Sequence, residues 1–595
     1  MTNVFLNFHE TLHMYERKMF SQDGVSTSDV IELAEKYDGV HRETLAVENH
    51  IDLRQCFSSI SSILSSWAHS NAVVSSEQLR HLVEIKSALV IMYLAGFDPK
   101  QEILLRGYNK DNGYKQNLTK ILLLISINNI TQDLYRAFLR IEPDTAYYIA
   151  CSWLMEKCQV TKNARVYHQK LVDGFDKYKD VKVEPEFFVR LSNVYMYTSY
   201  SNSVGKDEIK STICHQISNT IYRYNPIKDV STSRNKLRSK PTILIIHEKF
   251  ANNHVMMRCY LRTIAHLEEK FDLIHLAFAP KNYDQLHKEA SSIIAVDGNF
   301  RIAIKKIKEI DPDIILYPSL GMHPLPMMLS TLRLAPIQLQ LFGHPSSSFS
   351  KEIDGSWLNT LNFDTAGPEK CTKNVAYEGG IPIDINSLNF EYHMSNRPAS
   401  QLNEKLNVVV NGKSMKLSPR FIEFLGTINW PNDVQLNFFP AERGIYFAIT
   451  ESLIKKYFPK ARIYPTTDYD DYIKNLAIQD CAICPFPFGN TNCIIDSLKI
   501  GLPTFVLKGN EICSAAEYEL LNFCDLGDFV LSSQEEMAAA LTNFLHNKKL
   551  RLSLTEKFQT NANHYLTTNN VAKAQRIRAQ SWSNWITNHI VEYKI

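Results

Sequence analysis

The stretch that decides the fold is TILIIHEKFANNHVMMRCYLRTIAHLEEKFDLIHLAFA, residues 242–279. Its first part, residues 242–250, is rich in β-branched side chains, which is typical of a strand that a parallel sheet buries on both faces. Residues 256–271 then predict a helix, and residues 272–279 predict a second strand. The order strand, helix, strand predicts a doubly wound α/β domain.

The same alternation continues after this stretch and occurs twice. The first run predicts a Rossmann-like domain over 240–392, and the second predicts another over 403–570, beyond the polar stretch 391–405. A last segment, 571–595, predicts a helix that packs across both domains, with Trp582 and Trp585 on one core-facing side. Two such domains joined by a linker predict a cleft, in which ligands bind beyond the carboxyl ends of the strands.

The N-terminal part of the chain, residues 1–235, has a different pattern. Apolar residues recur every three or four positions in 75–97 and 116–141, and Ser75 and Ser76 before Glu77 predict a helix start. We therefore expect an all-helical domain, followed by a polar, basic linker at 229–241. This domain is either a scaffold or a module that faces a partner or substrate.

Composition limits the classes of function. The 595 residues carry a net charge of +2, so no general electrostatic field favours nucleic acid or an anionic membrane. The N-terminus lacks the pattern of a signal peptide, no apolar stretch is long enough for a bilayer span, and the 11 cysteines have no framework spacing. These features predict a cytoplasmic protein with free thiols. Cys481 and Cys484 form a CxxC that a zinc site could use, but on a strand they face opposite ways, so we expect buried thiols.

The motif PFPFGNTNCIID, residues 485–496, predicts an anion site. Two prolines end a strand, Gly489 lets a backbone approach a ligand closely, and Asn490 or Thr491 can cap the helix that follows. A helix N-terminus at the mouth of a sheet suits a phosphate. Asn492 and Asp496 share a helix face, where the carboxylate can accept hydrogen bonds from a ribose.

Two more elements point to the same cleft. In VVVNGKSMKLSP, residues 408–419, a strand opens into Asn-Gly and places Lys413 and Lys416 at a helix start, without the spacing of a Walker A loop. The first domain places His247, Asn252, Asn253 and His254 after one strand, and Gly343, His344 and four serines after another. Two histidine-bearing loops at one cleft predict that a histidine acts as acid, base or orienting group.

YPSLGMHPLPMMLSTLRLAPIQLQLFGHPSSSFS (317–350) and PFPFGNTNCIIDSLKIGLP (485–503) closely resemble the bacterial cytoplasmic N-glucosyltransferases that modify adhesins. Those enzymes belong to glycosyltransferase family 41, with the O-GlcNAc transferases. HEKFANNH and SMKLSP fit the family in the same order, and the strong matches cover about residues 240–510. The chain resembles a divergent member.

The resemblance implies a GT-B fold and an inverting, metal-independent transfer of glucose from UDP-glucose to asparagine in Asn-x-Ser/Thr of a protein acceptor such as an adhesin. It implies no cofactor beyond the nucleotide sugar. Lys416 would contact the diphosphate, Asp496 the ribose, and His254 is the implied active-site histidine. The implied catalytic residues are His254, His344 and Lys416, and the implied nucleotide-sugar-binding residues are Gly343, Ser414, Lys416, Gly489, Asn490, Thr491, Asn492 and Asp496.

Electrostatics agrees with a reaction that needs no metal. The leaving diphosphate gains negative charge, which Lys416 and a helix dipole can stabilise in the transition state. Two acidic stretches resemble the DxD motif that binds a metal ion, but we interpret both differently. DPD (311–313) predicts a turn before a strand, and DYDD (468–471) predicts a helix start.

The sequence also departs from the family pattern. Relatives have glycine where Cys493 stands, and histidines in the stretches that correspond to 464–469 and 509–521. Two alternatives therefore stay open. One is a transferase of the same fold that uses another nucleotide sugar, or a serine or glycan acceptor. The other is a non-catalytic paralogue that binds a transferase or adhesin partner.

Overall fold

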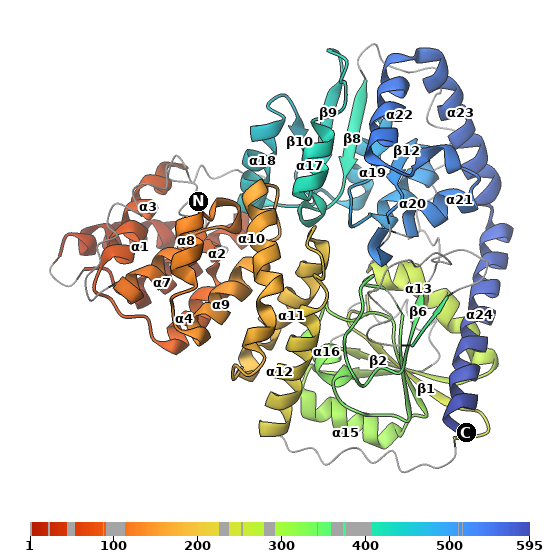
Figure 1. The fold of residues 1–595 in the computed structure, drawn as a ribbon, viewed down its shortest axis with the longest axis horizontal. Helices are drawn as coiled ribbons and strands as arrows, with labels where there is room; N and C mark the ends of the chain where they lie inside the picture. The colour runs from red at the N-terminus through yellow and green to blue at the C-terminus, as the bar shows by residue number, and fades with distance from the viewer. Residues whose placement is uncertain are drawn as a thin grey trace.

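The computed structural model describes thirteen stretches of the chain and shows three parts (Figure 1). A helical part comes first, followed by two parallel sheets with helices around each. Asn252 and Asn253 lie outside the described residues, as does most of the predicted linker 229–241. The described residues are 3–21, 24–44, 54–86, 88–90, 114–224, 237–251, 254–278, 292–341, 343–358, 373–376, 406–509, 511–514 and 516–594.

The helical part is built from amphipathic helices with defined starts. The predicted start at Ser75 is confirmed, because the Ser75 hydroxyl accepts from the Gln78 N–H at 3.1 Å and the Gln78 side chain accepts from the Ser75 N–H at 3.0 Å. The helices are α1 (Asn3–Met19), α2 (Thr27–Thr44), α3 (Arg54–His69), α4 (Ser76–Glu84), α7 (Tyr114–Leu124), α8 (Gln132–Phe138), α9 (Pro143–Leu154), α10 (Lys162–Asp173), α11 (Phe188–Tyr197) and α12 (Ile209–Tyr224).

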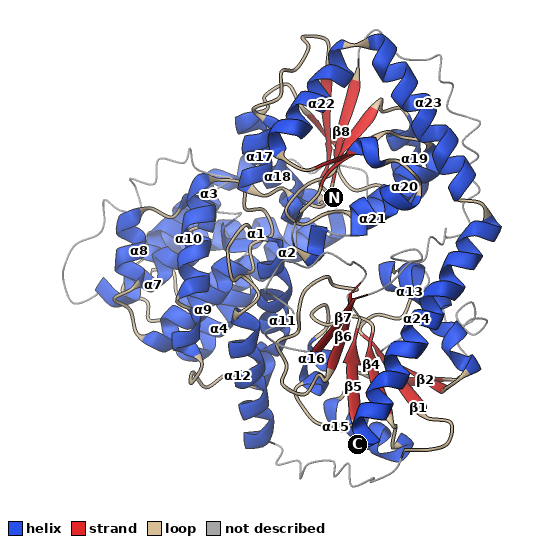
Figure 2. Cartoon of the chain, turned by 45° about the vertical axis from the view of Figure 1, so that its right-hand side comes forward, coloured by secondary structure: helices blue, strands red, loops and turns tan. Residues whose placement is uncertain are grey.

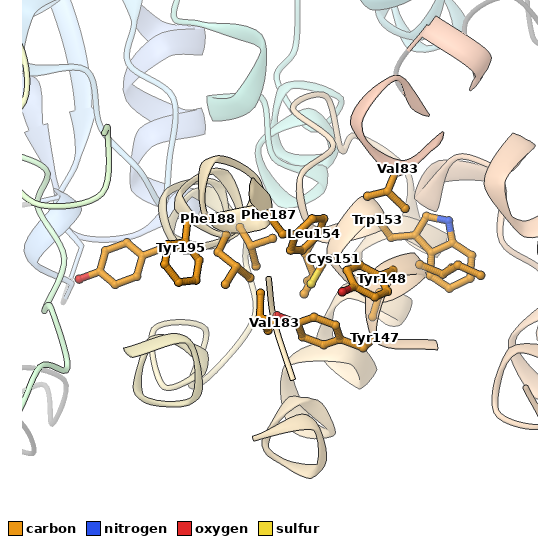
Figure 3. Packing of buried hydrophobic residues seen from close by; sticks show 14 of the residues in the cluster. Val83, Tyr147, Tyr148, Cys151, Trp153, Leu154, Val183, Phe187, Phe188 and Tyr195 are labelled. Atoms are coloured by element: carbon orange, nitrogen blue, oxygen red, sulfur yellow. The ribbon is translucent and has the colours of Figure 1, made fainter. Parts of the chain in front are cut away.

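The core of the helical part is aromatic and continues to its edge (Figure 3). Tyr147 and Trp153 of α9 are fully buried, and the Tyr147 hydroxyl donates to Gln216 at 2.9 Å. Tyr195 lies at one end of the cluster with its hydroxyl pointing away from the other labelled side chains (Figure 3). That hydroxyl donates to the Ser348 carbonyl at 2.9 Å, so the helical part is joined to a loop of the first sheet domain.

The first sheet has seven parallel strands in the order β3-β2-β1-β4-β5-β6-β7. The chain reverses its direction of travel across the sheet between β1 and β4, which is the position where doubly wound sheets bind ligands. The strands are β1 (Thr242–His247), β2 (Asp272–Phe278), β3 (Ile293–Val296), β4 (Ile314–Tyr317), β5 (Ile337–Gln340), β6 (Gly355–Leu358) and β7 (Lys373–Ala376), and the helices are α13 (Val255–Ala265), α15 (Phe300–Ile310) and α16 (Pro324–Ser330).

The second sheet has six parallel strands in the order β10-β9-β8-β11-β12-β13, with its reversal between β8 and β11. Helices flank the strands of both sheets in Figure 2, as a doubly wound fold requires. The strands are β8 (Asn407–Asn411), β9 (Gln435–Phe439), β10 (Arg462–Ile463), β11 (Cys481–Ile483), β12 (Thr504–Leu507) and β13 (Val530–Leu531), and the helices are α17 (Pro419–Leu425), α18 (Gly444–Tyr457), α19 (Tyr469–Ala477), α20 (Thr491–Ile500), α21 (Ala516–Phe523), α22 (Gln534–His546) and α23 (Lys548–Tyr565).

The last helix, α24 (Thr568–Lys594), leaves the second sheet domain and runs along the first (Figure 1). Its Arg578 donates to the Cys259 carbonyl at 3.0 Å and lies 4.8 Å from the ring centre of Tyr260 on α13. Trp582 and Trp585 are both buried, which confirms that they pack in the core. The chain therefore ties its C-terminal end back to the first sheet domain.

The predicted buried thiols are confirmed at Cys481 and Cys484, which form no disulfide and are enclosed in the second sheet domain. In the described part of the chain, no three His, Cys, Asp or Glu side chains gather as a metal site would require. None of the described helices has both the length and the apolar character of a bilayer span.

A buried histidine pair on β1 and β2 predicts acid sensitivity. His247 Nε2 and His275 Nδ1 are 2.9 Å apart. Burial lowers the pKa of His275 to about 4, and burial together with His275 holds the pKa of His247 well below its usual value. Above pH 6.5, about the pKa of histidine in the unfolded chain, both histidines are neutral and the folded protein has its full stability. As the pH falls from there through the folded pKa, the unfolded state binds protons more readily than the folded state, so this stability is lost. We expect His275 alone to remove about 3 kcal/mol of unfolding free energy between pH 6.5 and 4.

Urea denaturation across this pH range measures the effect in the wild type and in His275→Gln. The variant removes one titrating imidazole, so its stability should fall less steeply on acidification. His546→Gln, at an exposed histidine, is the control. Equal slopes for wild type and His275→Gln would contradict the prediction.

Candidate active site

A cavity of about 450 Å³ lies between the two sheets, within the size range of small-ligand sites. Loops at the carboxyl ends of strands from both sheets line it, and Met196 and Tyr200 of the helical part close one side. Of the residues implied as catalytic or nucleotide-sugar-binding, all except Ser414 line this cavity, whereas His247 is buried in β1 and does not. The residues brought together are His254, Gly343, His344, Lys416, Gly489, Asn490, Thr491, Asn492 and Asp496.

Lys416 joins the two loops at the reversal point of the second sheet. Its ammonium group donates to the Gly489 carbonyl at 2.6 Å and to Asn490 Oδ1 at 3.0 Å, and lies 5.1 Å from the ring centre of Phe488. Burial lowers the pKa of Lys416, while the neighbouring thiol of Cys493 and carboxylate of Glu517 act in the opposite direction. The cation is therefore fixed beside the start of α20.

The start of α20 corrects the predicted helix cap. Asn490 occupies the N-cap position, but its side chain makes no capping hydrogen bond. Its Nδ2 donates instead to the Asn411 carbonyl at 2.6 Å and to Cys493 Sγ at 2.7 Å. Thr491 is itself the first residue of α20, and its hydroxyl donates to Glu517 at 2.6 Å. The capping prediction is wrong because the acceptor that a cap needs, Asn490 Oδ1, accepts from the Lys416 ammonium group instead.

Glu517 is a site residue that the sequence interpretation missed. It is buried at the start of α21, where burial raises the pKa of its carboxyl group although the Thr491 hydroxyl and Lys416 act against this. A Cβ on Gly489 would lie 2.2 Å from Glu517 Cδ. A side chain at position 489 would therefore displace the Glu517 carboxylate from its place beside Thr491.

Asp496 connects the two sheet domains across the cavity. Its Oδ1 accepts from the Tyr469 hydroxyl at 2.7 Å and from Arg258 Nη2 at 3.2 Å. The side chains of Arg258 and Asp496 are only 9% and 4% exposed. Arg258 belongs to α13, one helical turn after His254, so the i, i+4 spacing could have indicated it.

His254 caps α13, and its hydrogen-bond geometry defines its tautomer. Nδ1 accepts from the Met256 N–H at 3.4 Å, so the ring hydrogen is on Nε2. Burial, with Lys249 and Lys413 nearby, lowers the pKa of His254 to about 4. At neutral pH this side chain is an uncharged hydrogen-bond donor.

His344 lies where the three parts of the chain meet. Its ring centre is 5.8 Å from that of Tyr200 in the helical part and 5.9 Å from that of Phe488 in the second sheet domain. The rings of Tyr200 and Phe488 are 4.0 Å apart. Gly343 precedes it, and a Cβ there would lie 2.0 Å from the Met256 side chain and 2.8 Å from the Pro318 carbonyl. The close packing of this loop therefore requires glycine.

Ser414 is the predicted site residue that the structure places elsewhere. It is buried beside Glu442, to which its hydroxyl donates at 2.5 Å, and it is not part of the cavity lining. Ser414 begins a single 3-10 turn that ends at Lys416, so these two side chains face different directions.

The two facing doubly wound sheets, with a final helix that returns to the first, define a GT-B glycosyltransferase fold. A mutant O-GlcNAc transferase from Thermobaculum terrenum has the same fold, with a TM-score of 0.55 over 98% of this chain and 99% of that chain, at 10% identity. The predicted fold class is confirmed.

The chain is also similar in sequence to the UDP-glucose:protein N-beta-glucosyltransferases of Actinobacillus pleuropneumoniae serotype 5b (strain L20) and serotype 7 (strain AP76). Each is 28% identical over 381 residues, which is 61% of this chain. The match spans 60% of the length of these relatives. No family model matches the chain. The resemblance predicted from the sequence motifs is confirmed.

Proposed function

We propose that this protein transfers glucose from UDP-glucose to asparagine side chains of Asn-x-Ser/Thr in a protein acceptor such as an adhesin. The observation that carries the proposal is the cavity between the two sheets, which combines the fixed cation of Lys416 with the N-terminus of α20. Similarity to two UDP-glucose:protein N-beta-glucosyltransferases supports the choice of donor and acceptor.

The reaction is a single displacement with inversion. The acceptor nitrogen bonds to the anomeric carbon from the face opposite UDP, and the bond from that carbon to the diphosphate oxygen breaks with its electron pair. One hydrogen of the acceptor amide leaves as a proton, which the departing UDP or water takes up. Lys416 and the α20 dipole stabilise the charge that develops on the diphosphate, which serves in place of a metal. The N-terminal turn of α20, which begins with Asn490, Thr491 and Asn492, lies against the phosphates and contributes its dipole. Asp496 holds the ribose, and His254 donates a hydrogen bond from Nε2.

We propose the division of the chain that its sequence predicts: a helical domain at 1–235, GT-B domains at 240–392 and 403–570, and a terminal helix at 571–595. None of the described cysteines forms a disulfide, and we propose that the protein works in the cytoplasm, where thiols stay reduced.

Mass spectrometry of Asn-x-Ser/Thr peptides incubated with the protein and UDP-glucose tests the function. We expect one added hexose on asparagine, with a β linkage in the NMR spectrum of the product. Parallel reactions contain UDP-galactose, UDP-N-acetylglucosamine, serine peptides and glucosylated peptides. Transfer only in one of these reactions would support a different sugar or acceptor, and UDP binding without any transfer would support a non-catalytic paralogue.

The departure from the family pattern at Cys493 has a structural consequence at the start of α20. Its thiol lines the cavity and takes one of the two Nδ2 hydrogens of Asn490, while the other goes to Asn411. Neither hydrogen is then available to a phosphate.

Cys493→Gly is expected to release one Nδ2 hydrogen and strengthen UDP binding roughly fivefold, equivalent to about one net hydrogen bond. Unfolding free energy should fall by only about 0.3 kcal/mol, because glycine is a slightly poorer helix former than cysteine. Calorimetry with UDP measures the affinity, and Cys493→Ser, which keeps an acceptor, is the matched control. Unchanged or weaker binding by Cys493→Gly would contradict this role of Cys493.

A further inference from the structure

A fully buried lysine of the helical part, Lys210 on α12, lies beside the loop that carries His344. Its ammonium group has three hydrogens and three side-chain acceptors. These are Ser199 Oγ at 2.9 Å, Asp207 Oδ1 at 3.0 Å and the hydroxyl of Ser346, two residues after His344. The cation therefore joins α12 to this active-site loop.

Ser199 links this cation to His344. Its single hydrogen goes to Asp207 Oδ1, at 2.9 Å, so its oxygen acts as acceptor in its other contacts. Those contacts are Lys210 and His344 Nε2, the latter at 3.2 Å. His344 Nε2 must therefore carry the ring hydrogen, which leaves Nδ1 as the unprotonated nitrogen.

The charges around His344 keep it in this form. Burial, and then Lys210, lowers the pKa of His344 to about 3, with Lys416 and Lys206 acting in the same direction and Asp207 against it. Burial alone raises the pKa of Asp207, but the two lysines of the helical part lower it to about 2, so it stays ionised and holds the Ser199 hydrogen. His344 is thus neutral at physiological pH.

The rest of the loop is attached to the same helices. The Ser348 carbonyl accepts from the Tyr195 hydroxyl at 2.9 Å and from the Cys214 thiol at 3.5 Å. Among the residues that the structure describes, none donates to His344 Nδ1, and His344 lines the cavity.

We propose that the helical part is a positioning element of the active site: Ser199, held by Lys210 and Asp207, fixes His344 as the Nε2–H tautomer and leaves Nδ1 to accept a hydrogen bond from a substrate O–H or N–H group. The substrate contact rests on the proposed function, whereas the fixed tautomer does not. Ser199 and Lys210 are positioning residues, since they act through His344.

Nitrogen NMR of the full chain with ¹⁵N-labelled histidine tests the tautomer directly. His344→Gln identifies the His344 signals by their loss. The wild type should show protonated Nε2 and unprotonated Nδ1, Ser199→Ala should show mixed tautomers, and Ser199→Thr, which keeps the hydroxyl, should restore the wild-type pattern. This readout is independent of catalysis, so it separates failure of this proposal from failure of the proposed function.

Kinetics tests the consequence. Ser199→Ala and Lys210→Met should lower kcat for transfer roughly tenfold, as expected for one lost buried hydrogen bond. The same variants can be assayed for hydrolysis of UDP-glucose in the absence of acceptor peptide. This hydrolysis should fall as much as transfer does if His344 Nδ1 faces the sugar, and should stay unchanged if Nδ1 faces the acceptor. Lys120→Met is the matched control, because Lys120 is a buried lysine of the helical part that donates to the Trp67 and Ser70 carbonyls.

Two results would overturn the proposal. One is an unchanged His344 tautomer in Ser199→Ala. The other is an equal loss of kcat in Lys120→Met, which would show that any destabilised helical part slows the enzyme.

Discussion

Lys416→Ala is expected to lower the turnover of glucosyl transfer by about 10²–10³-fold, the usual effect of removing one preorganised group from a developing anion. The lysine is held at 2.6 Å from the Gly489 carbonyl beside the start of α20, so its charge needs no rearrangement during the reaction. Its removal should affect kcat more than donor KM, because the charge on the diphosphate grows in the transition state.

Steady-state kinetics with UDP-glucose and an Asn-x-Ser/Thr peptide measures this change. Lys455→Ala is the control, since Lys455 is a half-exposed lysine of α18 that pairs with Glu451. Circular dichroism should show the same fold in both variants. The loss of an oxyanion-stabilising group lowers turnover by much more than a few-fold. If Lys416→Ala turns over within a few-fold of the wild type, Lys416 does not stabilise the leaving diphosphate.

The second large effect is expected at Asp496, where Asp496→Asn should lower both stability and donor affinity. The substitution keeps the shape of the side chain but leaves the guanidinium of Arg258 buried without its counter-charge. Loss of one partner from a buried ion pair costs about 3 kcal/mol of unfolding free energy. Urea denaturation measures the stability, and calorimetry with UDP-glucose measures the affinity.

The double variant Arg258→Met, Asp496→Asn separates the two roles of Asp496. Without either charge, much of the stability should return, while donor affinity stays low because the ribose contact is still missing. Asp471→Asn is the matched control, because Asp471 forms an exposed pair with Lys474 that contributes little. Recovery of donor affinity in the double variant would contradict the ribose contact.

Much of the fold was predictable because its signals are local. A strand buried on both faces needs a continuous apolar run, and Thr242–His247 of β1 is buried at every position. The site was predictable in outline for a related reason. Parallel strands present their carboxyl ends at one edge, so the loops after β8 and β11 had to lie side by side.

The errors and omissions concern side chains whose partners lie far away along the chain. Asn490 was expected to cap its own helix, but it bonds to the Asn411 carbonyl, 79 residues earlier. Arg258 meets Asp496 across 238 residues, and Ser199 meets His344 across 145. Local spacing carries no information about such pairs.

The sequence by itself determined the two doubly wound domains, the cleft between them, and the residue types at its mouth, because apolar periodicity and turn residues act over a few positions. Only the tertiary structure decided what those residues contact: that Asp496 pairs with Arg258, that Glu517 packs on Gly489, and that the helical part holds His344. The physical reason is that hydrogen-bond and charge partners are fixed by how separately formed elements pack, and that packing depends on the shape of the whole chain.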